Sequence, residues 1–255
     1  MEIRKTLIIS VTSVKGGTGK TINTLNLAGI YSKLTKKVLI IDLDLYAGDI
    51  AAILNIDNKR DIYNVFEDVT NNKFNDINDY ITKYNDNIDV LCAPNDPRFA
   101  NRINSTIINF ILTKVSKKYD IILIDTNHFL NSINLTAFDR SDEILYILKN
   151  DLMNLKSMKT MVSIYSNMGR DNYKIILYEA LNRNNGSYSN MDIKNVIKHD
   201  IDYIISSSFN IRNINQEILK GNILTLSNIS HHYPKIMKVY NDIANNLLEK
   251  VKYEK

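Results

Sequence analysis

The strongest constraint on the fold is the alternation of short, wholly apolar runs with longer segments of helical spacing. The apolar runs, rich in Ile, Leu and Val, occupy residues 7–14, 38–41, 88–91, 121–124, 144–148 and 175–181. The segments of helical spacing occupy residues 21–34, 102–116, 152–167 and 214–220. Strands buried on both faces of a parallel sheet have this continuous apolar character, and helices of this kind form the crossovers between them. The pattern predicts an α/β fold: a doubly wound, mostly parallel sheet flanked by helices.

Composition predicts a single domain over residues 1–255. The chain is 44% hydrophobic and 24% charged, which is enough apolar material for one large core, and no proline- or serine-rich linker divides it. The net charge of +4 permits DNA as a partner without indicating it. Cys92 is the only cysteine, so an intramolecular disulfide is excluded and a reducing cytoplasm is the expected location. No stretch reaches the roughly 18 apolar residues that cross a bilayer, so any membrane contact is expected to be indirect.

A glycine-rich loop joins the first predicted strand to the first predicted helix, and from Ser13 to Thr21 it reads SVKGGTGKT. It fits the phosphate-binding pattern G-x-x-x-x-G-K-[ST], except that Ser13 or Val14 replaces the first glycine. Backbone N–H groups of such a loop point at phosphate oxygens, at the positive end of the following helix. Lys20 would reach the β- and γ-phosphates, and the Thr21 hydroxyl would ligate Mg²⁺. The loop residues assigned to the nucleotide are Gly16, Gly17, Thr18, Gly19, Lys20 and Thr21. The prediction is binding of ATP with Mg²⁺; the alternative is a glycine turn that binds nothing.

Acidic residues follow two further predicted strands. Asp42 and Asp44 come after the run 38–41, and the alternation of side chains along a strand points both the same way, into the phosphate site. One carboxylate can sit in the water shell of Mg²⁺ while the other orients the attacking water. Asp125 follows the run 121–124 and is predicted to hold Mg²⁺ through water. The alternative for Asp42 and Asp44 is that they end a strand and cap a helix.

The segment KGGTGKT resembles the deviant Walker A motif of the ParA/MinD family of P-loop ATPases. In that family the first lysine, here Lys15, crosses a dimer interface and touches the phosphates of ATP on the partner. Such a charge would stabilise phosphoryl transfer, whereas the alternative is an ordinary solvated lysine. The resemblance implies a homodimer that forms on ATP binding and hydrolyses ATP slowly. The roles it implies are catalysis by Lys15, Lys20 and Asp44, and a metal site formed by Thr21, Asp42 and Asp125.

Two further positions are interpreted through the same resemblance. The family commonly recognises adenine with an asparagine at a strand end, and Asn182, followed by Arg183, matches that position. The family's prolines after the Walker B aspartate are replaced here by Asn127 and His128. His128 is expected to be a solvent-facing loop residue, with proton transfer as the alternative.

One branch of the family matches more of the chain. Residues 42–50 (DLDLYAGDI), the pair Ala93–Pro94 and the strand 119–126 resemble the CpaE/TadZ proteins, which position pilus or secretion assemblies. Tyr46 and Ala47 depart from that branch, which usually has a polar and an aromatic residue there. The resemblance implies a cytoplasmic ATPase that is recruited to the cell pole or the inner face of the membrane. Its implied partners are proteins of a Tad-type pilus or secretion assembly.

Three other functions remain open on the sequence alone. A ParA-type DNA-partitioning ATPase would need a basic stripe across the dimer, with Lys36, Lys37, Arg183, Arg212 and Lys220 as candidate members. A MinD-type septum-placement ATPase would use a C-terminal amphipathic helix on the membrane; the pattern over 235–252 predicts such a helix, but packed on the domain. A metabolic P-loop ligase or synthetase would need a second substrate pocket.

Overall fold

The computed structural model describes residues 6–179 and 188–253, and it confirms the predicted fold class. An eight-stranded sheet has the order β3-β4-β2-β5-β1-β6-β7-β8. Every neighbouring pair is parallel except β3 and β4, which are antiparallel. The strands are β1 (Leu7–Thr12), β2 (Val38–Leu43), β3 (Thr82–Lys83), β4 (Ile88–Leu91), β5 (Ile121–Thr126), β6 (Glu143–Lys149), β7 (Tyr173–Glu179) and β8 (Tyr203–Ser206).

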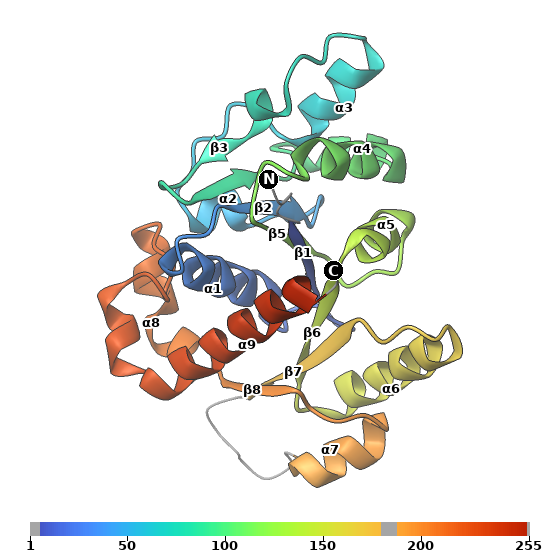
Figure 1. The fold of residues 1–255 in the computed structure, drawn as a ribbon, viewed down its shortest axis with the longest axis vertical. Coiled ribbons are helices and arrows are strands. Elements are labelled where there is room, and N and C mark those ends of the chain that lie inside the picture. The colour runs from blue at the N-terminus through green and yellow to red at the C-terminus, as the bar shows by residue number, and fades with distance from the viewer. Residues whose placement is uncertain (1–5, 180–187, 254–255) are drawn as a thin grey trace.

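Helices cover both faces of this sheet (Figure 1). The α-helices are α1 (Lys20–Lys33), α2 (Ile50–Ile53), α3 (Ile62–Thr70), α4 (Ser105–Val115), α5 (Ser132–Arg140), α6 (Leu152–Asn167), α7 (Asn190–Ile197), α8 (Ser208–Leu219) and α9 (Pro234–Tyr253). Helices α1, α8 and α9 lie on one face, and α4, α5 and α6 lie on the other. Within the described ranges, no helix is long and apolar enough to span a bilayer.

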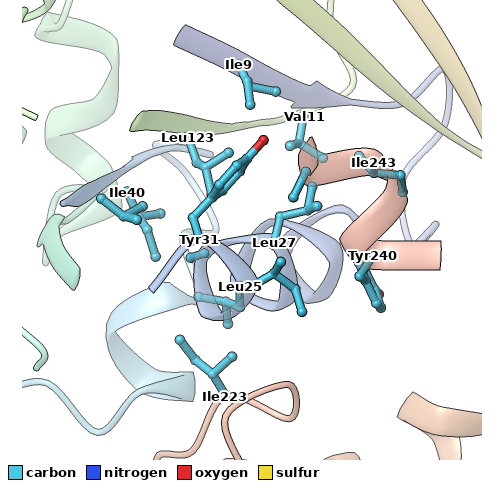
Figure 2. Packing of buried hydrophobic residues seen from close by; sticks show 14 of the residues in the cluster. Ile9, Val11, Leu25, Leu27, Tyr31, Ile40, Leu123, Ile223, Tyr240 and Ile243 are labelled. Atoms are coloured by element: carbon cyan, nitrogen blue, oxygen red, sulfur yellow. The ribbon is translucent and has the colours of Figure 1, made fainter. Parts of the chain in front are cut away.

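Side-chain alternation along the strands divides the core into two layers. On β1, Ile9 and Val11 pack toward α1 and α9, while Ile8 packs toward α4. On β5, Leu123 joins the first layer and Ile124 the second. Figure 2 shows the first layer, where side chains of α1 and α9 meet those of β1 and β5. Burial on both faces explains why these strands read as unbroken apolar runs.

Helix α9 is anchored to α1 through a buried tyrosine. Five of its side chains lie in the core layer with α1: Ile236, Tyr240, Ile243, Ala244 and Leu247. The Tyr240 hydroxyl donates to Oδ1 of Asn23 over 2.7 Å and accepts from Nδ2 of Asn26 over 3.1 Å. Because Asn23 Nδ2 in turn donates to the Gly19 carbonyl over 2.9 Å, α9 braces the end of the glycine loop.

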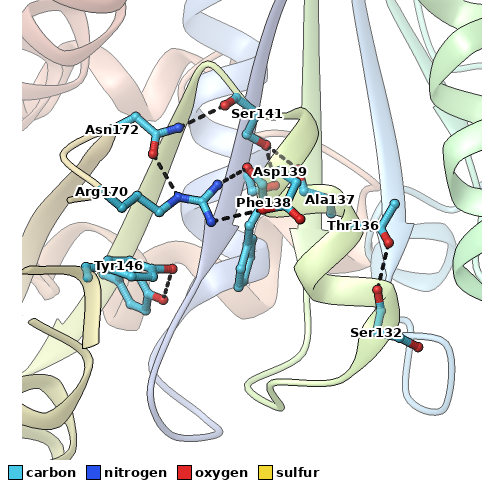
Figure 3. A network of polar contacts seen from close by, with 11 residues as sticks. Ser132, Thr136, Ala137, Phe138, Asp139, Ser141, Tyr146, Arg170 and Asn172 are labelled. Atoms are coloured by element: carbon cyan, nitrogen blue, oxygen red, sulfur yellow. Dashed lines mark hydrogen bonds and ion pairs between the residues drawn. The ribbon is translucent and has the colours of Figure 1, made fainter. Parts of the chain in front are cut away.

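A polar network closes the opposite layer beside β6 (Figure 3). Arg170 Nε donates to Asn172 Oδ1 over 2.9 Å, and its Nη2 donates to the Phe138 carbonyl over 2.5 Å. Asn172 Nδ2 donates to the Ser141 carbonyl over 3.0 Å, and Arg170 also pairs with Asp139 at 3.2 Å. The network joins the end of α5 to the loop before β7, so it supports the fold away from the glycine loop.

Several predicted boundaries were wrong, for physical reasons. The first strand ends at Thr12 rather than at residue 14, because residues 13–19 already form the loop. The helix predicted at 102–116 is Ser105–Val115, since Asn104 caps it by accepting from the Ile107 N–H. The helix predicted at 214–220 begins earlier, at Ser208. Strand β8 was missed because its four residues are too short a run to stand out.

Candidate functional site

The three predicted strand ends meet at one edge of the sheet. Strands β2, β5 and β1 are consecutive neighbours, and all three are parallel, so their carboxyl ends lie side by side. Asp125 pairs in register with Asp42 on one side and with Val11 on the other. Neighbouring strands are about 4.8 Å apart, so the two aspartates are adjacent and close to the start of the glycine loop. In doubly wound sheets this edge is where ligands bind.

The glycine loop is built to present backbone N–H groups. Gly17 and Gly19 have φ of 68° and 97°, in the left-handed region that glycine adopts without steric cost. Gly19 precedes α1 as its N-cap, and in the described structure no side chain caps this end and no acid occupies its first turn. The N–H groups of the first turn are therefore open to an anion.

A buried hydroxyl in the same loop supports the phosphate assignment. Thr18 Oγ1 is enclosed, yet it has no hydrogen-bond partner among the described residues. Buried polar atoms are nearly always satisfied, so an orphaned one in this place fits a site completed by a ligand. The loop residues thus fit a phosphate group on the evidence of their own geometry.

Thr21 and Thr24 fasten α1 to the end of β5. Thr21 Oγ1 donates to Asp125 Oδ2 over 2.6 Å, and Thr24 Oγ1 donates to Asp125 Oδ1 over 3.1 Å. Burial raises the pKa of Asp125 to about 6, against the lowering effect of the Thr21 hydrogen bond and of Lys20. The predicted metal residues Thr21 and Asp125 are therefore in direct contact, with the Lys20 charge close enough to act on the carboxyl.

Asp42 holds the loop that follows β2. It is 1% exposed, and its carboxylate accepts from the backbone N–H groups of Asp44 over 3.1 Å and Ile50 over 3.3 Å. A methyl group on Gly48 would lie 2.7 Å from Asp42 Oδ2 and 2.4 Å from Ala93 Cβ, so only glycine fits there. Burial raises the pKa of Asp42 well above its usual value, and the neighbouring Asp125 charge raises it further. Asp42 therefore also accepts from the first N–H of α2, although the N-cap residue of that helix is Asp49.

Asp44 lies beyond the end of β2 and is half-buried. Burial raises the pKa of this carboxyl, while the charges of Lys20 and His128 lower it and that of Asp49 raises it. Asp44 is therefore within electrostatic reach of both the glycine loop and the loop after β5. A half-exposed carboxylate in this position can accept a hydrogen bond from water, as the predicted role requires.

Lys15 is half-buried at the mouth of the loop. Its carbonyl accepts from Ser13 Oγ over 2.5 Å. This bond stabilises the turn at the position where the phosphate-binding pattern usually has its first glycine. Gly16 and Gly17 beside it are exposed, so this rim of the site is open to a second molecule.

His128 was predicted to face solvent, but in the structure it lies against the glycine loop. Its imidazole lies over Gly16: a methyl group on Gly16 would be 3.6 Å from Cε1 and 3.7 Å from Nδ1. His128 is half-buried and packs on Phe129 with ring centroids 4.2 Å apart. Sequence reasoning missed this placement, although the position directly after the third strand end was a signal for it.

The remaining predicted residues are placed away from this edge or not described. Asn182 and Arg183 lie outside the described residues, and so does the side chain of Arg212. Lys36 and Lys37 lie between α1 and β2, at the amino end of the sheet. Lys220 lies at the end of α8 and pairs with Glu217 at 3.4 Å. The described members of the basic stripe therefore do not border the glycine loop.

The arrangement can bind and orient a nucleotide. Loop N–H groups and Lys20 supply positive charge for phosphates, while Thr21 and Asp125 would hold Mg²⁺, which neutralises phosphate charge when bound. In the part of the chain that is described, no group of three or more His, Cys, Asp or Glu is placed to hold a metal by itself. A site of one hydroxyl with water-bridged carboxylates suits Mg²⁺, because this ion keeps several waters and binds to nucleotide phosphates.

Known proteins share both this sequence pattern and this fold. A family model described as an AAA domain matches residues 6–175. An uncharacterized ATP-binding protein of Methanocaldococcus jannaschii is 25% identical over 150 residues, which are 58% of this chain and 55% of that protein. The chain thus spans about half the length of that relative.

Solved structures establish the fold. A ParA family ATPase from Chlorobium tepidum superposes with a TM-score of 0.78 at 17% identity, covering 94% of this chain and 98% of that one. The septum site-determining protein MinD from Pyrococcus horikoshii, solved with Mg-ADP, superposes with a TM-score of 0.76 at 22% identity, covering 98% and 100%. The chain belongs to the AAA domain family, and its fold is that of the ParA and MinD ATPases.

Proposed function

We propose that this protein is an ATP-binding, slowly ATP-hydrolysing switch that dimerises on ATP and positions a cellular machine. The observation that carries the proposal is the convergence of one glycine loop and three aspartates on a single sheet edge. Thr21 is hydrogen-bonded to Asp125 there, and the Lys20 charge is close enough to act on both Asp125 and Asp44. In this proposal Asp44 orients the attacking water, while Asp42 and Asp125 support Mg²⁺.

Dimerisation is supported by the character of the surface beside the glycine loop. Lys15 lies at the mouth of the loop, the loop after β5 exposes Phe129, and the first turn of α6, which follows β6, exposes Met153; these side chains are 58% and 60% exposed. Leu130 and Leu152 beside them are also exposed. Large apolar side chains gathered at one edge suit a protein interface. In the proposed dimer, Lys15 reaches the phosphates bound by the partner and stabilises the charge of phosphoryl transfer.

The test is the molar mass in solution, measured by light scattering after size exclusion. The wild type, Lys15→Ala and Lys235→Ala are each run with Mg²⁺ and either ADP or a non-hydrolysable ATP analogue. Lys235 is exposed at the start of α9 and serves as the matched lysine control. We expect dimers only with the ATP analogue, and only in the wild type and Lys235→Ala. A mass that never responds to nucleotide contradicts the switch.

The machine that we propose is a Tad-type pilus or secretion assembly. The support is the CpaE/TadZ-like segment at residues 42–50, whose loop is held by Asp42 and needs glycine at Gly48. The protein would then act in the cytoplasm, recruited to a cell pole or to the inner face of the membrane through partner proteins. A fluorescent fusion at native expression should form polar foci that Lys20→Ala disperses. Spreading over the nucleoid would instead favour DNA partitioning, and a uniform membrane signal would favour septum placement.

A metabolic ligase is less well supported by the cavities. A cavity of about 390 Å³ is lined by Tyr84, Lys220, Asn222 and Ser227 among others. Tyr84 lies in the turn between β3 and the amino end of β4, whereas the glycine loop follows the carboxyl end of β1. A second substrate in this cavity would therefore be at the wrong end of the sheet to receive a phosphoryl group.

A further inference from the structure

We propose that His128 is a specificity-determining residue of the nucleotide site: its imidazole hydrogen-bonds the terminal phosphate of a nucleoside triphosphate and so favours ATP over ADP. This inference rests on the proposed function, because it assumes that the glycine loop binds a nucleotide. It assigns a role to a residue for which the phosphate-binding pattern has no position.

The first argument is the place of the ring. His128 lies beside Gly16, with Cε1 and Nδ1 at 3.6 and 3.7 Å from a methyl group placed there, while Gly16 itself stays exposed. Backbone N–H groups of such a loop take the α- and β-phosphates. A side chain that enters over Gly16 from the β5 side, next to Asp44, therefore faces the phosphate that remains, the terminal one.

The second argument is that the backbone on both sides of His128 is anchored by hydrogen bonds. The carbonyl of Asn127 accepts from Thr12 Oγ1 over 3.3 Å. Its side-chain oxygen accepts from the Phe129 N–H over 2.9 Å and from buried Asn134 Nδ2 over 2.8 Å. His128 is thus positioned by anchored backbone, which limits the ordering cost of a contact with a ligand.

The third argument is chemical. A neutral imidazole always carries one N–H donor, and a protonated one carries two, so the contact needs no proton uptake. The ring is close enough to Asp44 for its charge to act on that carboxyl. It therefore approaches the part of the site where the attacking water is proposed to be. The alternative is that His128 only packs on Phe129, whose ring lies 4.2 Å away between centroids.

The experiment separates hydrogen bonding from packing. Affinities of the full chain for ADP and for a non-hydrolysable ATP analogue, each with Mg²⁺, are measured by calorimetry. The variants are His128→Phe, which keeps a packing ring; His128→Gln, which keeps an N–H donor; and His232→Ala, an exposed histidine control. We expect His128→Phe to weaken analogue binding roughly tenfold and to leave ADP binding within about twofold. His128→Gln should recover part of the loss, and His232→Ala should match the wild type.

A second readout does not depend on any variant folding. The imidazole ¹⁵N shifts of the wild type are recorded at fixed pH without nucleotide, with ADP and with the ATP analogue. The His128 resonance, assigned in the wild type by through-bond correlation with its backbone, should shift with the analogue and not with ADP. This inference alone is overturned if His128→Phe loses equal affinity for both nucleotides. It is also overturned if the His128 resonance does not shift selectively with the ATP analogue. Failure of the wild type to bind either nucleotide overturns the proposed function with it.

Discussion

The Thr21 hydroxyl donates a 2.6 Å hydrogen bond to Asp125 Oδ2, and this contact fastens the first turn of α1 to the carboxyl end of β5. The other carboxylate oxygen is taken by Thr24, so helix and strand are joined twice. The two groups proposed for Mg²⁺ are thereby held together before any metal binds, which reduces the rearrangement that binding requires.

Replacing Thr21 should therefore weaken nucleotide binding in a metal-dependent way. Thr21→Val keeps the shape and removes the hydroxyl, so affinity for an ATP analogue with Mg²⁺ should fall roughly tenfold or more. With EDTA in place of Mg²⁺, wild type and variant should differ little. Calorimetry measures both, and Thr113→Val on exposed α4 surface is the control. If Thr21→Val loses as much affinity with EDTA as with Mg²⁺, Thr21 contributes only to the shape of the loop.

Gly48→Ala should destabilise the protein even without ligand. The added methyl group would lie 2.4 Å from Ala93 Cβ and 2.7 Å from Asp42 Oδ2, so backbone or carboxylate must shift. Overpacking of this kind costs about 1–3 kcal/mol of unfolding free energy, measured by urea denaturation. Gly16→Ala is the matched control, because its methyl group would meet His128 at an ordinary 3.6 Å. Equal stability of the two variants would contradict the steric argument.

The stability that Asp68 provides should depend on pH. The Tyr80 hydroxyl donates to Asp68 over 2.7 Å, and with Arg60 nearby it holds the pKa of this carboxyl below its usual value. A lowered pKa means that the folded state favours the ionised form. The stabilisation is therefore fully present above the pKa of Asp68 in the unfolded chain, which is about 4. It is lost as the pH falls through the lower pKa of Asp68 in the folded protein.

Asp68→Asn tests this by unfolding over a range of pH. The variant should be less stable than the wild type at pH 7, by about 1.5–3 kcal/mol, and the difference should shrink steadily below about pH 4. Glu67→Gln, on the exposed side of the same helix α3, should differ little at any pH. A difference between Asp68→Asn and wild type that persists at low pH would point to packing instead of charge.

Tyr240→Phe should weaken the brace between α9 and α1. The change removes a hydroxyl that is bonded to both Asn23 and Asn26 in the core, and leaves the ring in place. Buried amides that lose a partner cost about 1–3 kcal/mol of unfolding free energy. Tyr46→Phe is the control, because Tyr46 is 61% exposed. Thermal unfolding without ligand measures both, and no shift for Tyr240→Phe would show that packing alone holds α9.

The sequence was sufficient to predict the central strands of the sheet and the acidic residues at their carboxyl ends. Strands β1, β2 and β5 were evident because burial on both faces demands unbroken apolar runs, and Asp42 and Asp125 end two of those runs. Parallel neighbours then place such residues together without further information. The strand-alternation argument does not apply to Asp44, since β2 ends at Leu43, although this carboxyl is close enough to Lys20 for that charge to act on it.

Other features depend on contacts that no local pattern encodes. His128 and Gly16 are in contact because their loops, which are far apart in the sequence, follow the neighbouring strands β5 and β1. Neither loop alone predicts the contact. The same holds for Tyr240, whose partners Asn23 and Asn26 lie more than 200 positions earlier. The base contacts predicted for Asn182 and Arg183 stay predictions, because these residues lie outside the described ranges.

The brace from Tyr240 through Asn23 to the Gly19 carbonyl also has a consequence for synthesis of the protein. The glycine loop leaves the ribosome well before the helix α9 that braces it, because the two are far apart in the sequence. A nascent chain without α9 would carry the complete phosphate-binding motif on a helix that is joined to β5 but lacks the bonds from Tyr240. The full support of the glycine loop would then come only after α9 has been made, so the order in which these segments are synthesised differs from the order in which they depend on one another.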